Sequence, residues 1–204
     1  QTVKPCKPCE ELLKLQLPDV TILLAEAKPS DTIANPNEPW MPTVIISKPF
    51  CRVLGRISKE IHFELLLPTE SNGRFLMSGG GGFVGSIQNS FRDKVSDGFA
   101  TAGTDAGHQG GEDAKWAYNN MERQLNFGKL AIHRTAVVSK LIVQNYYCTA
   151  PSKSYFIGCS RGGGQAMMEA QQYPEDFDGI VAGAPAFAWP ALGGKFIQHT
   201  KSNY

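Results

Sequence analysis

The chain has 204 residues, 42% of them hydrophobic, which is enough to bury a core and predicts one globular domain. Lys and Arg number 20 against 19 Asp and Glu, and the net charge of +1 gives no electrostatic reason to expect nucleic-acid binding. The longest apolar runs, at 61–67 and 181–188, are too short or too interrupted to span a bilayer. We therefore expect neither a nucleic-acid nor a membrane partner.

The chain contains five cysteines, which is many for its length. Cys6-Lys7-Pro8-Cys9 has the CxxC spacing, but no second CxxC follows and the four histidines are scattered, so no metal site is predicted. Disulfide bonding in an export compartment fits these cysteines better. The chain begins at Gln1, as a mature protein does after signal removal, although such a start can equally be an arbitrary boundary of the sequence. We expect a secreted or periplasmic protein, with one cysteine free or paired outside these residues.

Residues 1–49 are rich in proline and are predicted to be irregular, apart from a brief helix and two short apolar runs at 9–15, 20–25 and 43–46. Alternating apolar and polar residues then predict strands at 51–57 and 61–67, which we expect to form an antiparallel pair at one edge of a sheet. Because His62 lies on the polar side of this alternation, we expect it to face solvent rather than to act in catalysis.

A short core strand at 74–77 runs directly into Ser78-Gly79-Gly80-Gly81-Gly82-Phe83. Apolar residues bracket the four glycines, so they are not a flexible linker. One interpretation is a loop whose backbone N–H groups stabilise an oxyanion, and the other is a phosphate-binding loop. A phosphate-binding loop needs Lys-Ser/Thr after its last glycine, whereas Phe83-Val84 follow here, which rejects that alternative.

The remainder of the chain alternates strands and helices. Further strands are predicted at 99–103, before Ser160 and at 178–185, and helices at 127–146 and from the glycines after Ser160 to Pro174. This order predicts a mostly parallel sheet with right-handed crossovers, and the fold class is an α/β-hydrolase. Asp105 and His108 follow the 99–103 strand, where we expect them to support the loop, and His133 is expected to be a helix-packing residue.

The strongest local signal is Gly158-Cys159-Ser160-Arg161-Gly162, between an apolar strand and a helix. Gly-x-Ser-x-Gly at a strand-to-helix turn predicts strained backbone with an exposed serine hydroxyl, and the helix N-terminus suits a developing oxyanion. On the pattern alone, a serine between glycines can equally be a simple turn. The strand before it and the helix after it favour a nucleophile.

A serine hydrolase also needs a histidine and an acid, which follow the serine along the chain in α/β-hydrolases. After Ser160 only His199 remains, and the acids lie on the following helix or just after it: Glu169, Glu175, Asp176 and Asp178. None stands at the end of a later strand, and the sheet lacks its C-terminal strands. We therefore expect the N-terminal portion of a longer enzyme, with the histidine and acid elsewhere.

Several motifs in the right order resemble the tannase and feruloyl esterase family. They span about Cys9 to Trp189 and comprise Phe50-Cys51-Arg52-Val53, Asn72-Gly73-Arg74-Phe75, the glycines 79–82, Thr104-Asp105-Ala106-Gly107-His108, the segment 154–163 and the segment 173–185. The resemblance implies that Ser160 is the nucleophile and that the backbone N–H groups of Gly82 and Arg161 form the oxyanion hole.

The resemblance further implies a disulfide between Cys9 and Cys51. Cys159 matches a family cysteine that pairs with one beside the catalytic histidine, so the missing C-terminal portion would be linked through Cys159. Cys6 and Cys148 match no family cysteine. In the family a lid domain, often holding calcium, follows the Ala-Gly-Ala-Pro strand, which implies that residues 1–186 are part of the catalytic domain and that 187–204 begin the lid. No cofactor is expected within this chain itself.

Three hypotheses follow. The first is a serine carboxylesterase that hydrolyses aromatic or phenolic acid esters, such as gallates and ferulates, through an acyl-enzyme; the isolated chain is expected to be inactive. The second is a catalytically incomplete binding or structural remnant of the fold. The third is another α/β-hydrolase, a lipase or peptidase, which the unusual Cys159-Ser160 pairing disfavours.

Overall fold

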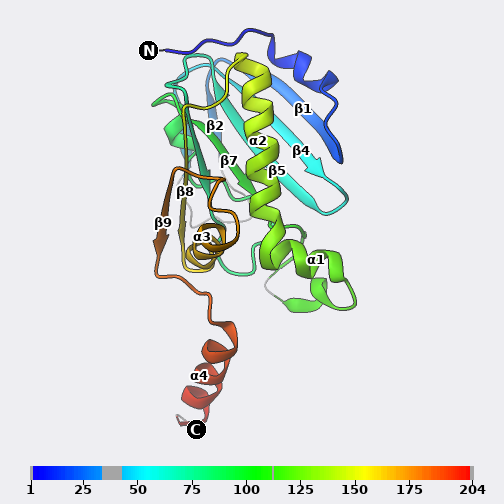
Figure 1. Cartoon of the computed structure of the whole chain (residues 1–204), viewed down its shortest axis with the longest axis vertical. Helices are drawn as coiled ribbons and strands as arrows, with labels where there is room; N and C mark the ends of the chain where they lie inside the picture. Colours follow the sequence, from blue (N-terminus) through cyan, green and yellow to red (C-terminus); the bar gives the residue numbers. More distant parts are fainter. Residues whose placement is uncertain (1, 34–42, 112, 203–204) are drawn as a thin grey trace.

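The structure, a computed structural model, describes residues 2–33, 43–111 and 113–202. Its main sheet has the strand order β1-β4-β5-β7-β6-β8-β9 (Figure 1). These strands are β1 (Val20–Lys28), β4 (Phe50–Ile57), β5 (Ile61–Pro68), β6 (Arg74–Ser78), β7 (Ala100–Thr104), β8 (Lys153–Cys159) and β9 (Gly179–Gly183). A separate hairpin pairs β2 (Asp31–Ile33) with β3 (Val44–Ile46).

The helices are α1 (Met121–Leu125), α2 (Ala131–Tyr147), α3 (Arg161–Gln172) and α4 (Trp189–Ser202). The helices predicted at 127–146 and after Ser160 are confirmed as α2 and α3, whereas α1 and α4 were not predicted. Short 3-10 turns lie at η1 (Cys9–Lys14), η2 (Arg92–Val95) and η3 (Ala114–Ala117), and a π-helical turn, η4 (Asn126–Leu130), joins α1 to α2. None of the helices within the described ranges is long and apolar enough to cross a membrane.

The sheet is half antiparallel and half parallel. From β6 onward the strands β7, β6, β8 and β9 pair in parallel, which confirms the prediction for that part of the chain. The antiparallel pairing of β4 with β5 is also confirmed, but the pair does not lie at the edge: β1 covers β4, and β5 pairs with β7.

The prediction that residues 1–49 are mostly irregular is wrong for β1. This strand is nine residues long and continues through Glu26 to Lys28, beyond the apolar run. Its backbone pairs with β4 along the whole length, with a register shift between Ile22 and Leu24. Pairing with a distant strand satisfies the backbone of these polar residues, which local sequence does not reveal. Residues 34–42, in the same stretch, lie outside the described part of the chain.

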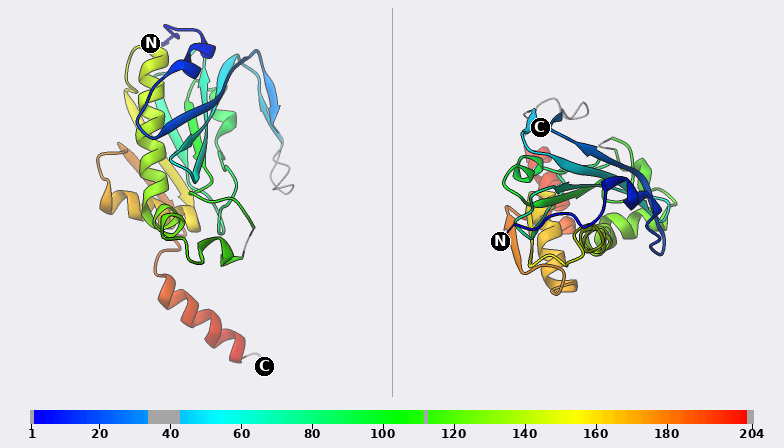
Figure 2. Two further views of the ribbon diagram at one scale, coloured as in Figure 1. Left: turned by 90° about the vertical axis from the view of Figure 1, so that its right-hand side faces the viewer. Right: turned by 90° about the horizontal axis from the view of Figure 1, so that it is seen from above.

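Two hydrophobic clusters cover the two faces of the sheet. Along β5, Leu65 and Leu67 belong to the larger cluster with Ile142 of α2, whereas Leu66 packs with Val95 of η2 on the other face. The edge-on view shows α2 and α3 on one side of the sheet and the β2–β3 hairpin on the other (Figure 2). The sheet is thus buried from both sides, as the nearly continuous apolar run of β5 requires.

The C-terminal region departs from the expected burial. The segment 178–185 was predicted to be a buried strand, but β9 is the outer strand of the described sheet, and Val181 is 57% exposed. Beyond it, α4 extends away from the sheet (Figure 1) and exposes Phe196 and Ile197. The boundary at 186 between the catalytic domain and a lid stays a prediction.

Two disulfides tie the N-terminal segment to the sheet and to α2. Cys9 pairs with Cys51 of β4, which confirms the pairing that the family resemblance implied, with Cα atoms 5.6 Å apart. Cys6 pairs with Cys148 at the end of α2, with Cα atoms 6.0 Å apart, a pairing that the sequence left open. Cys159 is free and exposed.

Removal of the Cys6–Cys148 disulfide is expected to lower the free energy of unfolding, because the bond joins positions 142 residues apart and restricts the unfolded chain. The double substitution Cys6→Ser and Cys148→Ser should cost about 2–4 kcal/mol in denaturant titration. Cys159→Ser is the matched control and should leave stability unchanged. Equal stability of the double variant and the control would contradict the pairing.

Candidate active site

Ser160 occupies a sharp turn between β8 and α3. Its φ of 58° and ψ of −118° place it in the left-handed half of the map, where a residue with a side chain is strained, and its surface is exposed. The turn is held from the end of β9: Ser160 N donates to Gly183 O at 3.0 Å, and Ala186 N donates to Ser160 O at 2.9 Å. These features confirm the predicted strained elbow.

The elbow needs glycine on either side because backbones approach closely there. A Cβ on Gly158 would overlap the carbonyl of Gly162 one turn later. A Cβ on Gly79 would lie 2.7 Å from Gly162 Cα, so the glycine loop after β6 packs directly on the first turn of α3. The glycines of the Gly-x-Ser-x-Gly motif and those of the loop therefore allow the same close approach of the loop backbone to the first turn of α3.

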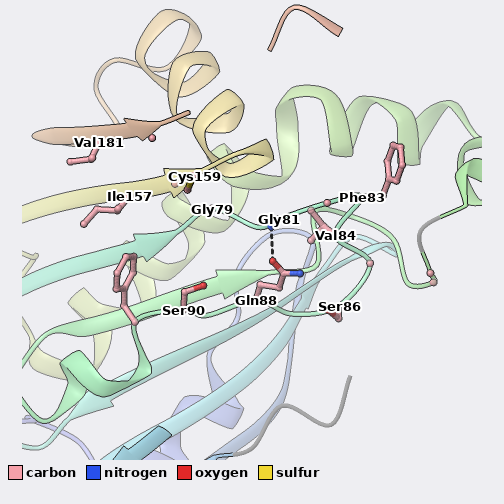
Figure 3. Close-up of a pocket in the computed structure, with 17 residues that line it drawn as sticks. Gly79, Gly81, Phe83, Val84, Ser86, Gln88, Ser90, Ile157, Cys159 and Val181 are labelled. Carbon is pink, nitrogen blue, oxygen red and sulfur yellow. Dashed lines mark hydrogen bonds between the residues drawn. The ribbon is translucent and has the colours of Figure 1, made fainter. Parts of the chain in front are cut away.

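The loop at 79–82 presents its backbone to the same region. Gly79 N donates to Ile157 O at 3.0 Å, Gly80 N to Gln165 Oε1 at 3.0 Å and Gly81 N to Gln88 Oε1 at 2.6 Å (Figure 3). The next N–H, of Gly82, has no acceptor within the described ranges.

The N–H of Arg161, at the start of α3, likewise lacks an acceptor among the residues placed by the structure. Two backbone donors are thus left unused near the elbow, as an oxyanion hole requires.

A cavity of about 880 Å³ opens along the glycine loop and the end of β8, and neither Ser160 nor Arg161 is among its lining residues. Gly82, Phe83 and Cys159, the residue before Ser160, contribute to its lining, and Figure 3 shows the glycine loop between Cys159 and Gln88. The volume is in the range of small-molecule sites. Gly82 has a φ of +56° and open space where a side chain would begin, so a ligand can approach its N–H.

His108 supports the glycine loop from below, in agreement with the predicted role. It is fully buried, its Nε2 donates to Phe83 O at 2.7 Å, and its ring stacks on Trp116 with centroids 3.7 Å apart. Burial lowers the pKa of His108 and so favours the neutral ring. Asp105, also buried, caps the neighbouring turn by accepting from Gly107 N at 2.8 Å.

His62 does not point freely into solvent as predicted. Its Nδ1 lies 3.0 Å from Asp105 Oδ2, its side chain is only 28% exposed, and Gln109 bonds to both. The polar face of β5 is covered, since Glu64 on the same side is buried and paired with Arg52 and Arg92 at 3.0 and 2.7 Å. Alternation alone cannot distinguish a solvated face from a face with buried ion pairs.

Behind the elbow, a polar cluster joins α3 to α2. His133 packs on Tyr173 with ring centroids 3.8 Å apart, as expected for a helix-packing residue, and its Nδ1 lies 2.6 Å from Asp176 Oδ2. The Lys140 ammonium donates to the backbone carbonyl of Asp176 at 2.7 Å and so brings a positive charge to the cluster. Glu169 is fully buried beside them, and its carboxyl oxygens have no hydrogen-bond partner among the residues described.

The buried carboxyl of Glu169 is therefore expected to keep its proton. Burial, reinforced by the negative charge of Asp176, raises the pKa of Glu169 to about 8. His133, Glu169 and Asp176 place ligand atoms within 4.8 Å of one another, close enough for a shared proton or cation. The sequence pattern does not reveal this cluster, because its members come from three separate segments.

The structure does not complete a catalytic triad around Ser160. Within the described ranges, no histidine or carboxylate hydrogen-bonds to its hydroxyl. His62, His108 and His133 have the partners given above, and His199 lies on α4 with its surface exposed. The elbow and the glycine loop are thus brought together through the contact of Gly79 with Gly162, whereas a general base is not brought to Ser160.

The sheet, its covering helices and the strained serine turn define the class of the fold as α/β-hydrolase. Residues 44–203 match the tannase and feruloyl esterase family. The chain belongs to that family, and this confirms the resemblance carried by the motifs.

Individual relatives agree with this assignment. A probable feruloyl esterase of Arthroderma benhamiae is 46% identical over 134 residues, which cover 62% of this chain and 25% of the relative. A probable feruloyl esterase B-1 of Aspergillus flavus is 37% identical over 183 residues, or 85% of this chain and 35% of the relative. The crystal structure of feruloyl esterase B from Aspergillus oryzae superposes with a TM-score of 0.79 at 34% identity, covering 87% of this chain and 37% of that one. The chain thus spans between a quarter and two fifths of these relatives' length.

Substitution of His108 is expected to destabilise the protein by loosening the glycine loop. His108→Ala removes the bond to Phe83 and the stacking on Trp116, and the free energy of unfolding should fall by roughly 2–3 kcal/mol. The measurement is denaturant unfolding, with exposed His199→Ala as the control. A cost below about 0.5 kcal/mol would show that the loop does not depend on this histidine.

Glu169 should make stability depend on pH. In the unfolded chain its carboxyl ionises near pH 4.5, whereas the folded protein retains the proton to about pH 8, so rising pH favours the unfolded chain across this window. Glu169→Gln should therefore lose less stability than the unsubstituted protein between about pH 5 and pH 8, by about 1 kcal/mol or more. Thermal melts at both pH values test this, with exposed Glu175→Gln as the control. Parallel pH profiles would contradict it.

Proposed function

We propose that this chain carries the nucleophile half of a serine carboxylesterase acting on aromatic or phenolic acid esters. Ser160 attacks the ester carbonyl, the alcohol leaves, and water releases the acid from the acyl-enzyme. The observation that carries the proposal is the strained, exposed Ser160 on a turn that packs against the glycine loop, with the N–H groups of Gly82 and Arg161 left without an acceptor among the described residues. The names of the feruloyl esterase relatives support the aromatic ester class.

The oxyanion hole would act on the tetrahedral intermediate. As the carbonyl oxygen becomes negative, a donor in a site shielded from water stabilises it by about 3 kcal/mol. Gly82 is held by the bonds of the three preceding glycines and by the His108 bond to Phe83. Arg161 N is fixed as the first residue of α3. Both donors are therefore preorganised.

The histidine and acid of the triad are proposed to come from polypeptide beyond these residues. Cys159 is free, exposed and adjacent to Ser160, and we propose that it forms a disulfide with a cysteine next to that histidine. The two disulfides already present favour an oxidising compartment and hence a secreted or periplasmic enzyme.

Substitution of Ser160 tests the proposal. In a polypeptide that carries this chain together with the proposed histidine and acid, Ser160→Ala should reduce kcat on methyl ferulate and methyl gallate at least about 1,000-fold. Ser202→Ala, on exposed α4, is the control and should retain activity. Persistence of both hydrolyses in Ser160→Ala would show that Ser160 is not the nucleophile.

A second candidate is a non-catalytic remnant that keeps the fold. It is favoured by one observation, that Ser160 has no general base within reach among the described residues. Covalent labelling by a fluorophosphonate separates the two, because only an activated serine reacts. Labelling that Ser160→Ala abolishes supports the esterase, and an unlabelled Ser160 in the complete polypeptide supports the remnant.

A further inference from the structure

The side chain of Arg161 is a buried cation with no acidic partner. Only 6% of the residue is exposed, and no carboxylate forms an ion pair with it within the described ranges. Its Nη2 donates to Phe127 O at 2.6 Å, its Nε has no acceptor, and the guanidinium carbon lies 4.4 Å from the centre of the Phe127 ring. One carbonyl and one aromatic face do not replace the anion that a buried guanidinium ordinarily pairs with.

The position of Arg161 in its helix makes its unpaired positive charge still less favourable. It is the first residue of α3, where the helix dipole presents its positive end, so a cation here is less favourable than at any later turn. Burial lowers the pKa of Arg161 only to about 10, which leaves the group charged at neutral pH. A negative charge supplied from outside would therefore be stabilised by both the guanidinium and the helix.

The guanidinium reaches a cavity of about 670 Å³ whose other walls are apolar apart from Gln171. A Cβ on Gly164 would overlap Ala186 O and lie 3.4 Å from Arg161 Nη1, so only glycine fits between the guanidinium and the segment before α4. The walls combine aromatic rings and thioethers from α3, the turn before α2, the segment before α4 and the first residue of α4: Phe127, Met167, Met168, Phe187 and Trp189. Phe187 and Trp189 are 58% and 40% exposed, which is unusual for such large apolar side chains.

We infer that the Arg161 pocket, formed by Arg161, Phe127, Met167, Phe187 and Trp189, binds a small aromatic carboxylate. The planar fork of the guanidinium suits a carboxylate, and the rings and thioethers suit an aromatic body. Binding needs no covalent step and does not depend on Ser160. The inference therefore stands apart from the proposed esterase activity.

Calorimetric titration with benzoate tests the inference on the unsubstituted protein. Benzamide has the same shape without the charge and is the matched ligand control. Benzoate should bind at least about ten-fold more tightly, because only the charged ligand pairs with the guanidinium. Equal affinities, or no binding of benzoate at millimolar concentration, would overturn the inference. Benzoate would also fail to bind if an acidic side chain of the protein already occupied the pocket, and that outcome overturns the inference as well.

Substitutions then locate the site. Arg161→Gln keeps the backbone N–H but removes the charge, and benzoate should bind it no better than benzamide. Phe187→Ala, at an exposed wall position, should weaken benzoate binding several-fold, whereas Phe196→Ala on the exposed face of α4 should not. Ser160→Ala should bind benzoate normally even if hydrolysis is lost. Unchanged binding in both Arg161→Gln and Phe187→Ala would place the ligand elsewhere and refute the assignment.

Discussion

The direct packing of the glycine loop on the first turn of α3 is the contact on which the candidate site depends. Gly79 and Gly162 approach so closely that a Cβ on Gly162 would lie 3.1 Å from Gly79 Cα. Because β6 and β8 are parallel neighbours, their ends deliver the loop and the elbow to the same edge of the sheet. A side chain at Gly79 would push the loop away from α3, since its Cβ would lie 2.7 Å from Gly162 Cα, and would so disturb the proposed oxyanion hole.

The strain at Ser160 is compensated by the structure around it. A left-handed, non-glycine residue costs about 1–3 kcal/mol, and it persists only where neighbouring contacts fix it. The end of β9 supplies two of these contacts through Gly183 and Ala186. On the far side of α3, Glu169 is fully buried beside His133 and Asp176, so the helix that follows the elbow is packed there as well. These contacts hold the strained backbone of Ser160 in place.

Features encoded by neighbouring residues could be predicted from the sequence, whereas features that join distant segments could not. The elbow, the glycine loop and the strands around them carry their signals in runs of glycine and apolar residues, and the structure confirms those elements. The extension of β1, the exposure of β9 and the Cys6–Cys148 bond depend on what the fold places alongside. The same holds for His62, whose partner Asp105 lies 43 residues away.

Helix α3 buries two ionisable groups, Arg161 and Glu169, whose charges cannot be neutralised in the same way. Arg161 and Glu169 have opposite charges, but eight residues of helix separate them by about 12 Å along the axis, too far for an ion pair. Glu169 can become neutral by keeping a proton, since its pKa is raised to about 8. Arg161 cannot become neutral by a change of protonation, because its guanidinium stays charged at neutral pH. Its charge must be met by an anion from outside the helix, and the open aromatic pocket is where that anion can enter.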